Sequence, residues 1–349
     1  MSLTVNLKRL SEANGVSSDE GSVRKIILNA IRDHVDEVRV DTLGNVLAIK
    51  RARGTAARRV RVMLDAHMDE IGLMIVRAND DGTLQFRAVG GIDDRILPGK
   101  VVLIGPDRLP GVIGTPPIHL AHGDDEVKKI EALAIDIGAA GKDEALGAVA
   151  IGQMATFNTR YRSLGTTVSG KAFDDRAGCA ILIELLQGPR LPVDLLAAFT
   201  VQEEVGLRGA HVAAYAFEPD AAIVIDATPA NDLPPSIDQD VSPNTRLGLG
   251  PAVYVMTRST VSDPRLVKHV ISIADRRGIP YQIRQPGGGG TDAGSIAPTR
   301  GGVPTVSISV PARYIHTPVA LINLNDVRHT IELVRESAAR LTSTILRRA

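Results

Sequence analysis

Four apolar segments of the sequence lead to side chains of the kinds that bind metal ions. The segments are residues 60–64, 195–201, 221–225 and 304–310, and they lead to His67, to Glu203 and Glu204, to Asp226 and, after a short loop, to His316. Helical patterns lie between and after them, at residues 178–187, 264–277 and 325–348. This alternation predicts an α/β domain with a mostly parallel sheet flanked by helices. Because the ligand crevice of such a sheet lies beyond the carboxyl ends of its strands, we expect these side chains to meet.

A stretch of different texture interrupts this pattern from about Gly72 to Ser169. It is rich in Gly and Pro, lacks a long amphipathic helix, and contains short β-like segments at residues 84–89, 101–104, 148–151 and 154–157. We therefore predict an all-β insertion. It divides the chain into an α/β domain of residues 1–70 and 170–349 and an inserted β-barrel-like domain of residues 71–169.

The N-terminal segment predicts a helix followed by two short strands. Apolar residues from Val23 to Val35 recur at helical spacing, and Ser17 with Glu20 three residues later matches the capping box that begins many helices. Strands are expected at residues 38–40 and 46–49, on either side of a turn rich in Asp, Gly and Asn.

Composition excludes several classes of function. The 40 basic and 40 acidic residues cancel, so no global field gathers nucleic acid or an anionic membrane, and the absence of Trp leaves few stacking platforms. The longest apolar run, Val212 to Phe217, is far shorter than the ~18–20 residues that cross a bilayer. The N-terminus lacks the apolar region of a secretory signal, and the single cysteine, Cys179, excludes an intrachain disulfide. We expect a cytoplasmic protein.

Two pairs of candidate residues allow an ordinary and a catalytic interpretation. His67 and Asp69 form a His-x-Asp pair, in which Asp69 could hold the second nitrogen of a metal-bound imidazole. The pair equally fits a hydrogen-bonded histidine at a strand terminus. Asp174 and Asp175 precede a helix, where one aspartate can serve as a cap. A carboxylate there can also bridge two cations roughly 3.5–4 Å apart.

The remaining candidates gain weight only as a set. Glu203 and Glu204 could divide the roles of ligand and proton acceptor at the strand end, or simply form a solvated strand-to-loop junction. Asp226 and His316 could each be a turn former or a satisfied surface group. Together the candidates supply two histidines and three carboxylates suited to Zn²⁺, Co²⁺ or Mn²⁺, namely His67, His316, Asp174, Glu204 and Asp226.

In chain order, these residues resemble the motifs of the glutamyl and tetrahedral aminopeptidase family of metallopeptidases, the M42 family. The motifs span nearly the whole chain, at residues 65–72, 173–176, 203–206, 226, 289–293 and 313–318. The resemblance implies a zinc-peptidase-like α/β fold with a dinuclear metal site and an inserted β domain that takes part in dimerisation. Because many members form tetrahedral dodecamers, it also implies a homo-oligomer based on dimers, up to a dodecamer.

The resemblance further implies a role for each residue of the site. His67 and Asp226 would bind one metal, Glu204 and His316 the other, Asp174 would bridge both, Glu203 would be the general base, and Asp69 would orient His67. Asp175 would be a neighbour of the site, joined to Asp174 by a cis peptide bond.

The loop of residues 287–292 would line the substrate pocket through Gly289, Gly290, Thr291 and Asp292. The sequence departs from the family at residues 317–320, where an acidic residue is common and none is present. This departure leaves the local contacts and the specificity open.

These assignments predict an aminopeptidase that removes the N-terminal residue of short peptides. It would use two divalent ions, most simply Zn²⁺, with Co²⁺ or Mn²⁺ as alternatives, and Glu203 would accept a proton from metal-activated water. Two alternatives stay open. A glycoside hydrolase, suggested because similar sequences sometimes carry an endoglucanase name, would need two carboxyl groups and no metal. A noncatalytic assembly protein would keep the fold without turnover. No nucleic-acid or membrane partner is expected.

Overall fold

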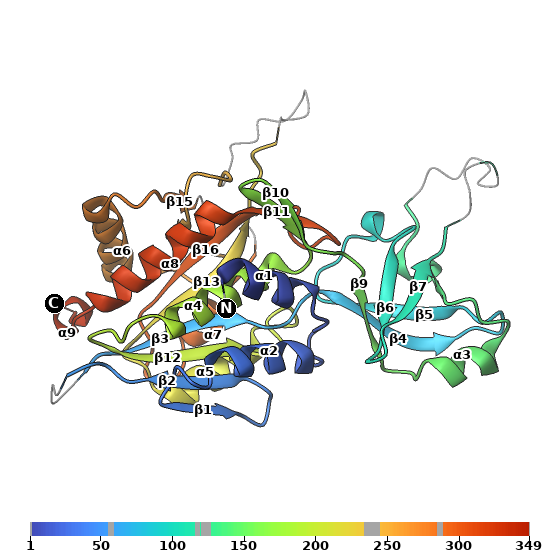
Figure 1. The fold of residues 1–349 in the computed structure, drawn as a ribbon, viewed down its shortest axis with the longest axis horizontal. Helices are drawn as coiled ribbons and strands as arrows, with labels where there is room; N and C mark the ends of the chain where they lie inside the picture. The colour runs from blue at the N-terminus through green and yellow to red at the C-terminus, as the bar shows by residue number, and fades with distance from the viewer. Residues whose placement is uncertain are drawn as a thin grey trace.

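The chain forms two folded units of different kinds, which lie side by side in space (Figure 1). The computed structural model describes residues 2–54, 59–115, 119, 127–233, 245–284 and 289–348. The larger unit is a mixed sheet flanked by helices, and the smaller one is a closed β-barrel. The expected fold class, an α/β sheet with an inserted all-β domain, is therefore confirmed.

The large sheet contains eleven strands within the described residues. Nine follow one another across the sheet: β1 (Glu37–Val40), β2 (Val46–Lys50), β12 (Asp194–Thr200), β3 (Arg61–His67), β13 (Ala221–Pro229), β16 (Thr305–Arg313), β17 (Ala320–Asn323), β11 (Thr167–Gly170) and β10 (Arg162–Leu164). The other two, β14 (Ala252–Tyr254) and β15 (Gln282–Arg284), branch from β16. The central strands β12, β3, β13 and β16 are parallel, whereas the strands on either side of this group pair antiparallel. The parallel arrangement predicted from the apolar runs thus describes the centre of the sheet, where both faces are covered.

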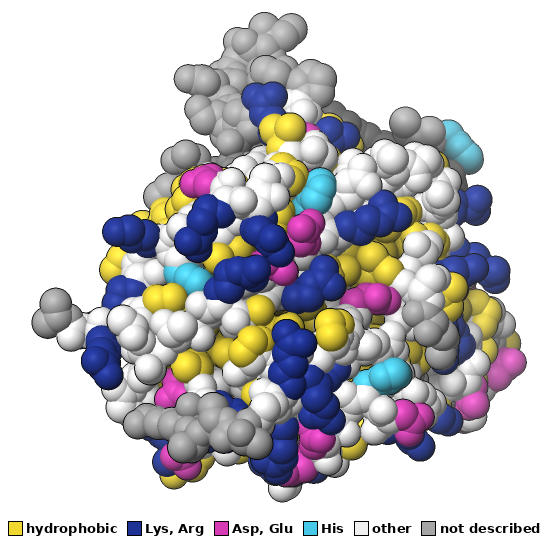
Figure 2. Space-filling view, turned by 60° about the vertical axis from the view of Figure 1, so that its left-hand side comes forward, with side chains coloured by type: hydrophobic (Ala, Val, Ile, Leu, Met, Phe, Trp, Pro, Cys, Tyr) yellow, Lys and Arg dark blue, Asp and Glu magenta, His cyan; other side chains and the backbone are white. Residues whose placement is uncertain are grey.

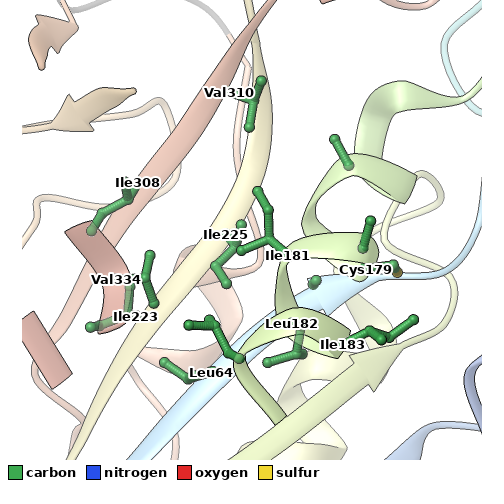
Figure 3. Close-up of a cluster of buried hydrophobic side chains, with 14 of the residues drawn as sticks. Leu64, Cys179, Ile181, Leu182, Ile183, Ile223, Ile225, Ile308, Val310 and Val334 are labelled. Carbon is green, nitrogen blue, oxygen red and sulfur yellow. The ribbon is translucent and has the colours of Figure 1, made fainter. Parts of the chain in front are cut away.

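Helices cover both faces of this sheet. One face packs against α1 (Leu3–Glu12), α2 (Gly21–Ile31), α4 (Phe173–Gln187), α6 (Pro264–Arg277) and α8 (Leu324–Ala339), and the other against α5 (Arg208–Phe217) and α7 (Ala293–Ile296). Figure 3 shows Ile181 and Leu182 of α4 facing Leu64 of β3 and Ile225 of β13. Each side chain of this kind contributes roughly 1.5–3 kcal/mol when fully buried. This packing fixes the strands whose carboxyl ends carry the candidate residues.

The N-terminal predictions hold for the strands but not for the helix cap. β1 and β2 form the expected hairpin, in which Asp41 Oδ1 accepts hydrogen bonds from the amides of Leu43, Gly44 and Asn45. The capping box is wrong: α2 begins at Gly21 without a side-chain cap. Ser17 instead donates to Asp69, because its hydroxyl turns away from the helix towards the end of β3.

The C-terminal half follows the sequence pattern closely, with one break. α6 has the predicted bounds, and the Asp263 side chain caps its first turn. The predicted helix of residues 325–348 is divided, because α8 ends at Ala339 and a separate short helix, α9 (Ser343–Leu346), follows.

The barrel closes in the order β4-β5-β8-β7-β6-β9. Its strands are β4 (Gly72–Ala78), β5 (Leu84–Val89), β6 (Val101–Ile104), β7 (Leu109–Ile113), β8 (Ile135–Asp136) and β9 (Met154–Phe157), accompanied by 3₁₀ turns η1 (Asp94–Ile96) and η3 (Ile130–Ala132) and by the helix α3 (Lys142–Ala148). The strand expected at residues 148–151 is wrong, because Ala145 and Val149 are buried four residues apart, at helical spacing, at the end of α3. After β9 the chain returns to the large sheet through β10 and β11.

The described surface carries both signs of charge. Figure 2 shows Lys and Arg side chains spread among acidic and apolar ones on the face that brings α6 and α9 forward. Among the described residues, no helix combines the length and the apolar character that a membrane span requires.

Candidate functional site

The candidate residues meet at the carboxyl ends of the central parallel strands. His67 is the last residue of β3, Glu203 and Glu204 follow β12, and His316 lies just beyond β16. Asp226 was expected just past a strand that ends at Ile225, but β13 continues to Pro229 and Asp226 lies within it, opposite Ser309 of β16. Asp174 reaches the same place from the start of α4. The sheet edge therefore gathers side chains that are far apart in the sequence.

Three combinations of these side chains place their ligand atoms within 4.8 Å of one another, close enough to hold a metal ion. They are His67 with Asp174 and Asp226, Asp174 with Glu204 and His316, and His67 with Glu203 and Glu204. Asp174 belongs to the first two groups. It is therefore the one side chain common to both of the ligand sets expected from the resemblance.

The carboxylate of Asp174 lies between the two histidines. Its Oδ1 is 2.9 Å from Nε2 of His67, and its Oδ2 is 3.3 Å from Nε2 of His316. The peptide bond from Asp174 to Asp175 is cis, as the resemblance implied. Asp175 turns the other way and accepts a hydrogen bond from the Gly178 amide at 2.9 Å, which is the helix-cap role open to one of the two aspartates.

The other two carboxylates flank this bridge. Asp226 Oδ1 is 3.8 Å from Nε2 of His67 and accepts the amide of Ala227. Glu204 Oε2 is 3.4 Å from Nε2 of His316. Each histidine thus faces Asp174 on one side and a second carboxylate on the other.

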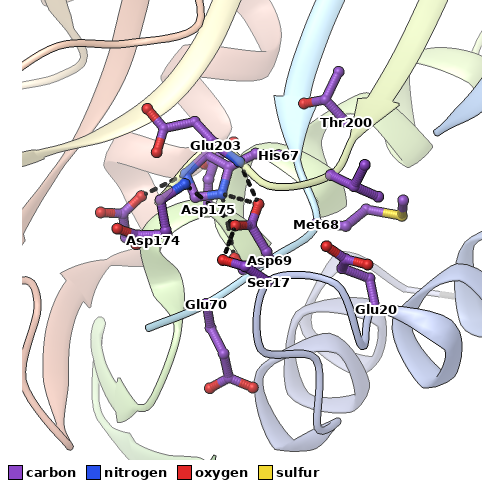
Figure 4. A network of polar contacts seen from close by, with 12 residues as sticks. Ser17, Glu20, His67, Met68, Asp69, Glu70, Asp174, Asp175, Thr200 and Glu203 are labelled. Carbon is purple, nitrogen blue, oxygen red and sulfur yellow. Dashed lines mark hydrogen bonds and ion pairs between the residues drawn. The ribbon is translucent and has the colours of Figure 1, made fainter. Parts of the chain in front are cut away.

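Asp69 lies between His67 and Ser17 (Figure 4), and it also bonds to the backbone of the Glu203–Glu204 pair. Its Oδ1 lies 3.4 Å from Nδ1 of His67 and accepts the Glu203 amide at 3.0 Å. Its Oδ2 accepts the Ser17 hydroxyl at 2.6 Å and the Glu204 amide at 3.2 Å. Nδ1 of His67 also lies 3.2 Å from the backbone carbonyl of Asp69, so this buried residue fixes the imidazole through its backbone and its carboxylate, and its carboxylate holds the backbone that carries both glutamates.

Burial and like charge make this cluster of acids costly without a cation. Burial raises the pKa of Glu204 to about 8, and the neighbouring Asp174 adds to the rise. Burial also raises the pKa of Glu203 and of Asp226 well above the ordinary range. Burial opposes a charge on His67, but hydrogen bonds to Asp174 and Asp69 outweigh it and raise the pKa of that imidazole. The clustered carboxylates therefore favour the binding of a cation.

A buried ion network supports the site from the N-terminal side. Lys171 Nζ donates to both carboxylate oxygens of Glu70 at 2.6 Å and to the carbonyl of Ala13 at 2.9 Å. Arg176, which is wholly buried, donates to the carbonyls of Met68 and Leu10. The network ties α1 and the segment after it to the end of β3, and it was not recognised from the sequence. The available signal in the sequence was the presence of the charged residues Glu70 and Arg176 within the motifs of residues 65–72 and 173–176.

A cleft of about 590 Å³ opens beside the gathered side chains. Gly289 and Gly290 line it, as expected for the substrate loop, and residues 287 and 288 of that loop lie outside the described residues. Thr291 and Asp292 are instead buried, because their side chains bond to Ser307 and Thr200, and neither is among the described residues that line the cleft.

The lining residues that the sequence did not predict include one aromatic and one basic side chain. Tyr254 and Arg284 come from β14 and β15, and the guanidinium of Arg284 lies 4.6 Å from the centre of the Tyr254 ring. Arg284 Nε also donates to Thr228 Oγ1 at 3.0 Å. These strands are only three residues long, so no extended apolar pattern marked them.

Known proteins of similar sequence cover almost the whole chain. A lysyl aminopeptidase of Pyrococcus furiosus is 33% identical over 340 residues, which are 94% of each chain. A glutamyl aminopeptidase of Lactococcus lactis is 31% identical over 338 residues, which are 93% of each.

Solved structures agree with this likeness. An aminopeptidase from Desulfurococcus kamchatkensis superposes with a TM-score of 0.93 at 34% identity, over 99% of this chain and 96% of that one. The TET1 peptidase of Pyrococcus horikoshii, described as assembling into a tetrahedron or a large octahedral shell, gives 0.86 at 36% identity over 97% and 100%. A Thermotoga maritima structure named endoglucanase gives 0.80 at 37% identity over 97% and 98%. The family described as M42 glutamyl aminopeptidase matches residues 44–333. The chain is therefore a peptide hydrolase that belongs to the M42 glutamyl aminopeptidase family.

Proposed function

We propose that the protein is a metal-dependent aminopeptidase that hydrolyses the N-terminal residue of short peptides. The observation that carries the proposal is the position of Asp174, one oxygen of which faces His67 while the other faces His316. In this assignment His67 and Asp226 would hold one divalent ion, Glu204 and His316 would hold the other, and Asp174 would contribute to both.

The donor set fits such a pair of ions. Imidazole nitrogens and carboxylate oxygens suit Zn²⁺, and they also accept Co²⁺ or Mn²⁺. The four carboxylates that line the cleft, Asp174, Glu203, Glu204 and Asp226, face one Lys or Arg among its described lining residues, Arg284. Burial, and then the repulsion from neighbouring Asp174, raises the pKa of Glu204 and of Asp226, and a divalent cation would offset both effects. We take Zn²⁺ as the first choice.

The chain's own residues supply proton transfer and orientation. Two bound ions would polarise the scissile carbonyl and lower the pKa of the attacking water from ~15.7 towards about 7. Glu203 lies beside the ligand groups and accepts the proton from this water, then passes it to the leaving amine. Asp69 holds the Glu203 amide and the Nδ1 side of His67, so the positions of the proposed base and of one proposed ligand are fixed relative to each other.

The cleft beside the metals is the place for the peptide's first residue. Gly289 and Gly290 line this cleft without side chains, so a substrate backbone can approach the loop closely. The relatives named above act on lysyl and on glutamyl residues, so the side-chain preference must come from the cleft wall, including Tyr254 and Arg284.

We further propose that the chain works as a homo-oligomer based on dimers, for which a dodecamer is one candidate form. Support comes from the TET1 relative, which forms closed shells, and from the separate barrel carried by the insertion. In this division residues 1–70 and 170–349 form the catalytic part and residues 71–169 the inserted part, the end of which rejoins the large sheet through β10.

Neither alternative from the sequence is favoured. The endoglucanase name of one similar structure belongs to that protein, and a glycoside hydrolase would need two carboxyl groups without a metal. A noncatalytic protein would have no need to keep Glu203 beside a complete set of ligand groups.

The test is hydrolysis of a panel of aminoacyl-p-nitroanilides and short peptides, before and after chelation and with Zn²⁺, Co²⁺ or Mn²⁺ restored. We expect metal-dependent release of one preferred N-terminal residue. Glu203→Gln should keep the bound metal and lose nearly all turnover, while the matched exposed change Glu218→Gln should alter neither. Hydrolysis that survives complete chelation, or normal turnover by Glu203→Gln, would contradict the proposal.

A further inference from the structure

His316 is the most exposed member of the candidate metal groups. Its side chain is 40% exposed, against 3% for His67. It lies on the loop between β16 and β17, where both Tyr314 and His316 have left-handed backbone angles. A side chain on such a loop needs a specific partner if it is to point in one direction.

That partner comes from the inserted part of the chain. Nδ1 of His316 lies 3.0 Å from the carbonyl oxygen of Gly91, 225 residues away in the sequence. Gly91 follows β5, the second strand of the barrel. In a neutral imidazole one nitrogen donates and the other accepts, so an Nδ1–H bond to this carbonyl leaves the Nε2 lone pair facing Asp174 and Glu204.

The preceding residue touches the second ligand of the same half. Gly90 has φ +83°, and a Cβ there would lie 2.8 Å from Ile71 and 3.3 Å from Glu204. The Gly90–Gly91 backbone therefore packs directly against both Glu204 and His316. Among the described residues, the side chains of His67 and Asp226 bond or pair with Asp69, Asp174, Ala227 and one another, none of which lies in the barrel.

A second contact from the inserted segment holds the same loop. Thr159, two residues after the last barrel strand β9, donates its hydroxyl to the Pro318 carbonyl at 2.7 Å. The segments after β5 and after β9 thus hold the His316 loop at two separate points.

We propose that the barrel is a working part of one metal position: the Gly91 carbonyl is a positioning group that fixes the direction of His316. The inference rests on the proposed function, since it concerns the metal held by Glu204 and His316. The affinity for that metal then depends on how the barrel is positioned against the large sheet. The affinity for the metal assigned to His67 and Asp226 does not depend on this position.

The test is Gly91→Ala, read by calorimetric titration of metal-free protein with Zn²⁺. Gly91 is outside the left-handed region, so alanine can adopt its backbone, but the new Cβ would lie 3.2 Å from Nδ1 of His316. The exposed imidazole is the group free to yield. We expect one Zn²⁺ position to weaken by about 10-fold or more and the other to keep its affinity.

Two further variants separate this effect from general damage. Gly147→Ala is the matched control, because it adds a Cβ in open space within the barrel helix α3, and it should leave both affinities unchanged. Thr159→Val removes the second contact without approaching a ligand and should weaken the same position as Gly91→Ala, by a smaller factor.

Each result decides the matter. Unchanged affinities in Gly91→Ala, or equal weakening of both positions, would overturn the role of the carbonyl. Wild-type protein that binds two Zn²⁺ without hydrolysing any peptide would refute the proposed function while the titration still tests the positioning. Wild-type protein that binds no Zn²⁺ would refute both.

Discussion

The two halves of the site use the same kinds of ligand but are built in opposite ways. The His67 half sits at the end of a central strand, is buried, and is held through Asp69 by the backbone after β12 and by Ser17. The His316 half lies on an exposed loop whose partner, Gly91, belongs to the inserted segment. One half is therefore fixed by the core of the large sheet, and the other by the contact between two folded units.

This difference separates stability from assembly of the site. In the first half a histidine balances several carboxylates inside the protein, so its loss would leave buried charges without a partner. In the second half the histidine is 40% exposed, so water can partly replace it and its loss should cost less folding energy than the loss of His67. Both halves are needed for chemistry, but the first should matter more for the fold.

The largest contrast is expected between His67→Ala and His316→Ala. His67→Ala should lower the free energy of unfolding of the metal-free protein by roughly 3 kcal/mol or more, because it leaves Asp69, Asp174 and Asp226 without their shared partner. His316→Ala should lower it by less, because the imidazole is 40% exposed and water can partly solvate the Asp174 and Glu204 carboxylates that it faces. Denaturant unfolding of both variants without metal measures this difference.

Metal content sharpens the same contrast. His316→Ala should keep the metal position of His67 and Asp226, with hydrolysis reduced by about 100-fold or more, whereas His67→Ala should bind no metal tightly. Equal destabilisation by the two changes, seen in denaturant, would mean that the halves are supported alike and that burial does not divide them.

Asp69→Asn should produce the next largest effect. Both oxygens of Asp69 accept hydrogen bonds, Oδ1 from the Glu203 amide and Oδ2 from Ser17 and the Glu204 amide. An amide NH₂ at either position would therefore face a donor. We expect kcat and the affinity for Zn²⁺ at the His67 position each to fall by about 10–100-fold.

Asp326→Asn provides the matched control for that variant. Asp326 is also fully buried, and its carboxylate accepts two backbone amides, those of Gly248 and Gly250. It should lose stability without changing kcat or Zn²⁺ affinity. If the two variants were equally impaired in kcat, Asp69 would act through the fold alone.

The sequence predicted the features that depend on local pattern. The parallel core strands are marked by continuous apolar runs, and α6 by its helical spacing and by the Asp263 and Pro264 that begin it. Because parallel strands present their carboxyl ends at one edge, the meeting of His67, Asp226 and the Glu203–Glu204 pair could also be predicted.

The sequence could not predict contacts between residues that are far apart in the chain. Some of these residues also match a local pattern, and the pattern then suggests a different partner. Ser17 and Glu20 match a capping box, yet the Ser17 hydroxyl bonds to Asp69, 52 residues away. Gly91 carries no side chain that could mark its carbonyl as the partner of His316. Asp292 matched the family motif, but its carboxylate turns to Thr200 inside the protein.

The smallest expected effect is that of Ser17→Ala. The change removes one donor from Asp69 Oδ2, which still accepts the Glu204 amide at 3.2 Å, so Asp69 keeps its place but is held less firmly. We expect stability to fall by about 1–3 kcal/mol. The Zn²⁺ affinity of the His67 position should fall by roughly 10-fold or less. Denaturant unfolding and calorimetric titration measure the two effects.

Ser11→Ala separates the two effects, because Ser11 is an equally buried serine near the same terminus. Its hydroxyl donates to the Lys171 carbonyl at 2.7 Å and does not reach Asp69. It should lose similar stability, since each change leaves one buried acceptor with fewer partners, while both Zn²⁺ affinities stay as they were. Were Ser11→Ala to weaken the His67 position as much as Ser17→Ala does, the N-terminal segment would support the site only by its packing, and the hydroxyl of Ser17 would have no role of its own in holding Asp69.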